Sequence, residues 1–65
     1  MNLRRKRHEQ HMTQEELAER AGLSTRYVGA IEHGDVSASV TVLGQIATTL
    51  GVELGDLLRR SSRKG

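Results

Sequence analysis

The chain has 65 residues, of which 35% are hydrophobic and 28% are charged, with no cysteine, no proline and Tyr27 as its one aromatic residue. This length allows a single small domain, and the composition excludes a disulfide framework, a thiolate metal site, a membrane-spanning helix and an all-β barrel or sandwich. Eight of the ten basic residues lie at the two ends, whereas residues 9–58 carry Arg20 and Arg26 against all eight acidic residues. Clustered basic residues favour a nucleic-acid partner, although charged ends also serve simply to keep a small protein in solution.

The first two predicted helices lie in the amino-terminal third of the chain. Residues 2–10 are rich in helix-forming side chains but offer a single apolar anchor, so they predict a first helix with thin packing. A second helix is predicted over about 14–21, because Thr13 and Glu16 have the spacing of a capping box, in which each side chain binds the other's backbone amide. Gly22 follows and is expected to end this helix by adopting the left-handed backbone conformation.

A third helix follows at once. Ser24 is a good N-cap, Val28 and Ile31 share a face turned towards the second helix, and Gly34 ends the segment. The connection between the two short helices is three residues long and joins two apolar inner faces. This pattern predicts a helix-turn-helix unit over about 13–33.

The remaining residues predict two more helices. A loop over 35–39 ends in a serine cap, apolar residues follow at helical spacing over 40–50, and Gly51 closes that helix. Leucines at 54, 57 and 58 predict a short fifth helix, and a basic tail follows over 59–65. The sequence as a whole therefore predicts a compact all-α domain of five helices (1–65).

The helix-turn-helix segment reads Thr13-Gln14-Glu15-Glu16-Leu17-Ala18-Glu19-Arg20-Ala21-Gly22-Leu23-Ser24 and continues with Tyr27-Val28, Ile31-Glu32 and Gly34. With these residues, and with the apolar positions that follow as far as Leu57, the chain resembles the phage-repressor or Cro-type helix-turn-helix family, also called the XRE family. The resemblance covers about residues 3–58. It implies a lambda-repressor-like fold, and a transcriptional regulator that binds double-stranded DNA as a homodimer on a pseudo-palindromic operator, with a recognition helix (about 24–32) in the major groove.

The resemblance also implies which residues contact DNA. Arg26 is our main candidate, because a guanidinium early in a recognition helix can pair with O6 and N7 of guanine, although the same side chain could contact a phosphate instead. Gln14 opens the preceding helix and is expected to contact a phosphate, and it could also brace the neighbouring recognition residue. Tyr27 could donate to a phosphate or simply pack on the core. The full set of expected DNA contacts is Gln14, Ser24, Thr25, Arg26, Tyr27, Ala30 and His33.

An ion pair and a dimer surface are also expected. The resemblance implies a structural ion pair between Arg7 and Glu32. Leu54, Leu57 and Leu58 exceed what a minimal core needs, so they are the candidate dimer surface, although core packing explains Leu57 equally well.

No catalytic or metal site is expected. His8 and His11 have the spacing of half a zinc site, but the chain has no cysteine, and zinc usually needs three or four protein ligands. The serines lie at caps and in the tail, and the acidic residues lie on solvated helix faces. We therefore expect no enzyme activity, metal, cofactor, small-molecule ligand or membrane contact, and a cytoplasmic, nucleoid-associated location.

Three alternatives remain open from the sequence. The chain could be an antitoxin-like module that binds a toxin protein and autoregulates its promoter, or a DNA-binding domain cut from a longer regulator. RNA binding is less favoured, because Tyr27 is the one aromatic side chain available for base stacking. A DNA-bound regulator of this size could block RNA polymerase or contact it as an activator.

Overall fold

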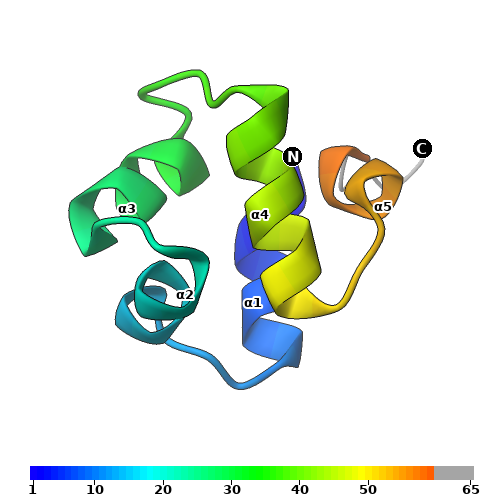
Figure 1. The fold of residues 1–65 in the computed structure, drawn as a ribbon, viewed down its shortest axis with the longest axis horizontal. Helices are drawn as coiled ribbons and strands as arrows, with labels where there is room; N and C mark the ends of the chain where they lie inside the picture. Colours follow the sequence, from blue (N-terminus) through cyan, green and yellow to red (C-terminus); the bar gives the residue numbers. More distant parts are fainter. Residues whose placement is uncertain (60–65) are drawn as a thin grey trace.

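The computed structural model describes residues 1–59, which fold into five α-helices and no strand (Figure 1). The helices are α1 (Leu3–Glu9), α2 (Gln14–Ala21), α3 (Thr25–His33), α4 (Val40–Leu50) and α5 (Leu54–Leu58). Each predicted helix is present with closely matching ends, so the all-α, five-helix fold is confirmed. Of the predicted basic tail (59–65), residues 60–65 lie outside the described part of the chain.

Three of the helices, α2, α3 and α4, begin where side-chain caps were predicted. Thr13 Oγ1 accepts a hydrogen bond from the Glu16 amide at 3.0 Å, and Glu16 Oε1 accepts one from the Thr13 amide at 2.8 Å. Ser24 and Ser39 cap α3 and α4 in the same way, at 3.0 and 3.2 Å. Each cap satisfies a backbone donor that the helix itself leaves unpaired.

The same three helices end at glycines. Gly22, Gly34 and Gly51 follow α2, α3 and α4 with φ angles of +74°, +80° and +71°. These angles lie in the left-handed region, where a side chain is strained and glycine is not. The chain therefore turns sharply after α2, α3 and α4 without a strained residue.

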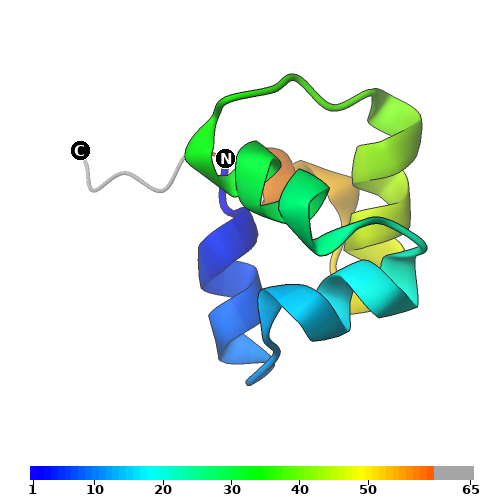
Figure 2. The same ribbon diagram turned by 90° about the vertical axis from the view of Figure 1, so that its left-hand side faces the viewer.

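The core lies between the helix-turn-helix unit and the other three helices. α2 packs against both α3 and α4, α4 packs against α5, and α1 closes the back of the domain beside α5 (Figures 1 and 2). The largest fully buried side chains come from all five helices: Leu3, Leu17, Val28, Ile46 and Leu57. No helix within residues 1–59 has the length and hydrophobicity needed to cross a membrane.

The start of the chain is tied to the end of α5. The Asn2 backbone amide donates to the Leu57 carbonyl oxygen at 2.9 Å, and Asn2 Nδ2 donates to the Asp56 carbonyl oxygen at 3.3 Å. These bonds satisfy two carbonyl oxygens of the short α5 helix. They hold α1 and α5 together although the two helices are at opposite ends of the sequence.

The predicted dimer surface requires a correction at Leu57. Its side chain is fully buried in the core of the single chain, because α5 turns this residue inward against α1 and α4. Leu58 is 46% exposed, and Leu54 is partly buried. Of the three predicted leucines, therefore, Leu57 has no exposed surface to offer a partner.

Candidate nucleic-acid interface

The α2–α3 unit presents one side of α3 to solvent. The Leu23 amide donates to the Ala18 carbonyl oxygen at 2.8 Å and fixes the turn that follows Gly22. Val28 and Ile31 then point into the core. Since 3.6 residues make one helical turn, the opposite side of α3 is left exposed, and it faces the viewer in Figure 2.

A buried ion pair holds α3 against α1. Arg7 Nε donates to Glu32 Oε2 at 2.7 Å, and Arg7 Nη2 donates to Glu32 Oε1 at 3.2 Å. The two side chains are 8% and 3% exposed. Arg7 Nη1 also donates to the Met12 carbonyl oxygen at 2.8 Å, so the guanidinium fixes the α1–α2 turn as well. Arg7 and Glu32 thus form the ion pair that the resemblance implied.

The surroundings of Glu32 favour its ionised form. Burial by itself raises the pKa of this carboxyl group, because it removes water from the charged state. The hydrogen bonds from Arg7 and Gln14, together with the positive charges of Arg7 and Arg4, outweigh burial and hold the pKa of Glu32 below its ordinary value. The carboxylate is therefore a charged acceptor that joins three helices.

Gln14 connects the first turn of α2 to α3. Its Nε2 donates to Glu32 Oε1 at 3.0 Å. Its amide lies over Gly29, where a Cβ atom would sit 3.5 Å from Gln14 Oε1, an ordinary contact distance. Gln14 therefore braces α3, which is one of the two roles that the resemblance implied for it, and its phosphate contact stays a prediction.

Four of the predicted contact residues surround one shallow hollow on the exposed side of α3. The hollow measures about 510 Å³. Arg26 and His33 are exposed, while Gln14 and Ala30 are partly buried. Asp35 also lines the hollow and was not predicted, because it follows the helix and belongs to no capping or apolar pattern. The lining residues are Gln14, Arg26, Gly29, Ala30, His33 and Asp35.

The other three predicted contacts have different surroundings. The Ser24 hydroxyl accepts a hydrogen bond from the Tyr27 amide and so caps α3. Tyr27 itself is partly buried and packs against the core, which was the alternative reading of this residue. Thr25 is exposed and lies with Gln14 and His8 along a second open hollow of about 640 Å³.

The histidines do not gather with other metal-binding side chains. His8 and His11 both line the second hollow, and His11 sits in the α1–α2 turn with a φ of +56°. Within residues 1–59, no group of three or more His, Cys, Asp or Glu side chains is placed to hold a metal ion. Neither histidine therefore has the partners of a metal site in this part of the chain.

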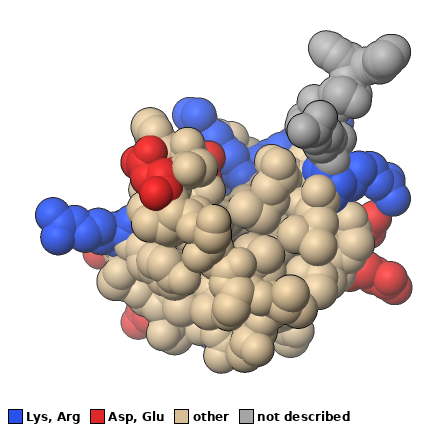
Figure 3. Space-filling view, turned by 90° about the horizontal axis from the view of Figure 1, so that it is seen from above, with Lys and Arg blue, Asp and Glu red and all other residues tan. Residues whose placement is uncertain are grey.

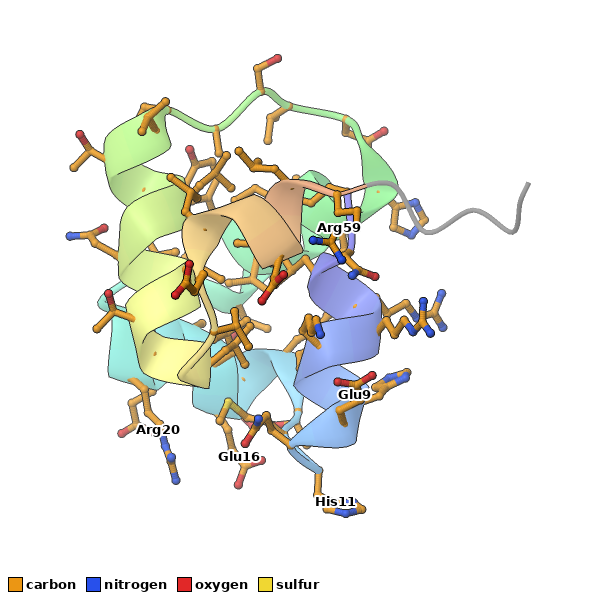
Figure 4. The ribbon with its side chains drawn as sticks, turned by 90° about the vertical axis from the view of Figure 1, so that its right-hand side faces the viewer. Glu9, His11, Glu16, Arg20 and Arg59 are labelled. Atoms are coloured by element: carbon orange, nitrogen blue, oxygen red, sulfur yellow. The ribbon has the colours of Figure 1, made fainter. Side chains whose placement is uncertain are left out.

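Charged side chains are unevenly spread over the surface. α4 contains no charged residue, and Figure 3 shows a broad uncharged area with both basic and acidic side chains at its edges. Three basic residues on α1 and just after α5 pair with acids: Arg5 and Lys6 with Glu9, and Arg59 with Asp56. Arg59 lies on the α5 side of the domain, which Figure 4 views from the direction opposite to Figure 2.

Comparison with known proteins gives one family and two relatives. A helix-turn-helix family model matches residues 3–57. An "uncharacterized HTH-type transcriptional regulator", y4dJ of Sinorhizobium fredii, is 37% identical over 57 residues, which cover 88% of this chain and 74% of the relative. A protein of Methanothermobacter thermautotrophicus with the same description is 43% identical over 51 residues, covering 78% of this chain and 74% of the relative. The comparison with solved structures found no significant match.

Proposed function

The chain belongs to the XRE-type helix-turn-helix family of DNA-binding transcriptional regulators, and from this we propose that it reads a specific double-stranded DNA sequence with α3. In this mode α3 enters the major groove and α2 crosses the backbone. The observation that carries the proposal is the exposed hollow on α3, where Arg26, Ala30 and His33 lie together beside Gln14.

Arg26 is the proposed base-reading residue. It is exposed in the first turn of α3 and forms no ion pair with any of residues 1–59, so its guanidinium is available for hydrogen bonds. Pairing with O6 and N7 of guanine contributes about 1–3 kcal/mol of discrimination. Gly29 and Ala30 on the next turn have little or no side chain, which permits close approach of α3 to the base edges.

The buried ion pair supports this role. A base-reading helix must be held rigidly, because hydrogen bonds to base edges depend on direction as well as distance. Arg7, Glu32 and Gln14 fix α3 against α1 and α2. Gln14 and Thr25, which border the same edge of the unit, are proposed to lie nearest a phosphate.

We further propose that two chains bind a pseudo-palindromic operator, with recognition helices about 34 Å apart in successive major grooves. Leu58 is the exposed leucine of the predicted dimer surface, and Leu54 lies partly exposed on the same short helix. Light scattering at tens of micromolar, with and without operator DNA, tests the pairing. A monomeric mass both with and without DNA would contradict the proposed dimer.

Selection from a randomised duplex library at about 150 mM salt tests sequence reading, because non-specific phosphate binding is weakened there. We expect an enriched palindrome with a fixed spacing between its half-sites. Arg26→Ala should lose a guanine preference at one position of each half-site. Binding that appears only at low salt, with no enriched sequence, would contradict the proposal.

A further inference from the structure

The helix-turn-helix unit carries few of the charges that DNA binding requires. Residues 13–34 contain two basic side chains, Arg20 and Arg26, against four acidic ones. Affinity for a duplex comes largely from basic groups that neutralise phosphates and release counterions. Another part of the domain must therefore supply phosphate contacts.

One flank of α1 lies beside the recognition helix. Arg4 lines an open hollow of about 370 Å³ together with Glu32 and His33, at the end of α3. His8, one turn further along α1, lines the hollow that contains Thr25, at the start of α3. Residues four apart share one side of a helix, so Arg4 and His8 define a single flank of α1 alongside α3.

Arg4 is the charged residue of this flank. It is exposed and makes no ion-pair contact with any described residue, unlike Arg5, Lys6 and Arg7 on the same helix. Its charge reaches α3, since it is one of the groups that lower the pKa of Glu32. His33 lines both this hollow and the one around Arg26, so the last residue of α3 shares one hollow with Arg4 and another with Arg26.

The dimensions of DNA place a phosphate strand next to this flank. The major groove is about 12 Å wide, and a helix with its side chains is about 10–12 Å across. A recognition helix therefore fills the groove, and a segment packed alongside it meets the backbone. We propose that Arg4 binds a phosphate of the DNA backbone at the edge of the major groove that α3 occupies. This inference rests on the proposed function, since it needs α3 to enter the groove.

The test is the salt dependence of DNA binding for Arg4→Gln. Loss of one phosphate contact should reduce the slope of log affinity against log salt by about 0.9 for each bound chain, and weaken binding roughly five-fold at about 150 mM salt. The preferred sequence should stay the same, because a phosphate contact carries no base information. Arg4→Lys should restore most of the slope.

Arg59→Gln is the matched control. It removes the same charge from the α5 side of the domain, facing away from α3, and should leave the slope nearly unchanged. An equal change in both variants would mean that only net charge matters, and no change in Arg4→Gln would mean that the contact does not form; either result overturns the inference. Equal melting temperatures of the variants exclude a folding effect.

The same comparison on a duplex of random sequence, at lower salt, separates this inference from the proposed function. A phosphate contact persists on any sequence. If the protein shows no operator preference but Arg4→Gln still reduces the slope, the proposed sequence reading fails and the Arg4 contact stands. If an operator is selected and Arg4→Gln behaves as the wild type, the proposed sequence reading stands and the Arg4 contact fails.

Discussion

Arg7 and Glu32 are 25 residues apart in the sequence, yet their side chains meet through two hydrogen bonds of 2.7 and 3.2 Å in the interior of the domain. The pair joins α1 to the last turn of α3. With Gln14 and the Met12 carbonyl oxygen it forms one polar network that links α1, α2 and α3. The orientation of α3 therefore depends on α1.

Removing one member of this pair should strongly destabilise the fold. In Arg7→Met the Glu32 carboxylate stays buried without its cation, and we expect a loss of about 3–5 kcal/mol in the free energy of unfolding. The double variant Arg7→Met/Glu32→Leu should lose much less, since it buries no charge. Urea unfolding followed by circular dichroism measures both; equal losses in the single and double variants would contradict the explanation.

The stability of the fold should depend on the ionisation of Glu32. Its pKa in the folded protein is lowered from the ordinary value of 4.5, so its contribution is present above that value and disappears as the pH falls through the lowered folded value. Glu32→Gln resembles the protonated form. The difference in unfolding free energy between wild type and Glu32→Gln should therefore shrink as the pH falls from about 6 to about 3. A difference that stays constant over this range would show that ionisation is unimportant.

Two glycines should respond to alanine in opposite directions. Gly44 lies inside α4 with open space around the position of a Cβ atom, so Gly44→Ala should raise the stability by about 0.5–1 kcal/mol. Gly22 ends α2 at a φ of +74°, so Gly22→Ala should lower the stability by about 1 kcal/mol or more. Thermal unfolding of the two variants measures both shifts. A destabilised Gly44→Ala would indicate a packing contact that the structure lacks.

Ser24 allows helix capping to be separated from DNA binding. Ser24→Ala removes the acceptor for the Tyr27 amide and should cost about 1 kcal/mol of stability. Ser24→Asp keeps a capping oxygen and the stability, but it places a negative charge at the start of the proposed recognition helix. We expect this variant to fold normally and to bind DNA more weakly than the wild type. Calorimetry measures the stability of both variants, and a binding titration measures their affinity for DNA. Undiminished DNA binding by Ser24→Asp would show that Ser24 lies away from the DNA backbone.

Much of the fold could be predicted because its helix boundaries are local. Thr13 and Glu16, Ser24 and Tyr27, and Ser39 and Val42 each interact across three residues. Such contacts form as soon as the first turn of the helix forms, whatever the helix later packs against.

Less of the candidate site could be predicted from the sequence. The spacing of Arg26, Ala30 and His33 marks one side of a helix, and the structure gathers them around a single hollow. The bonds from Arg7 to the Met12 carbonyl oxygen and from Gln14 to Glu32 had no signal in the periodicity, because they join side chains and turns of different helices. The flank of α1 beside α3 could not be predicted either, since the sequence shows a run of basic residues without showing which of them faces α3.

The sequence by itself determined the number of helices, their ends and the helix-turn-helix unit, because caps, stops and apolar spacing act over one or two turns of chain. The tertiary structure alone decided which leucine of α5 is buried, that the Arg7 guanidinium also bonds to the Met12 carbonyl oxygen, and that Asn2 bonds to the end of α5. Those outcomes depend on the rotation and crossing of packed helices. A shift of one residue on a helix turns a side chain by about 100°, enough to move it from core to solvent, and only contacts between distant segments fix that angle.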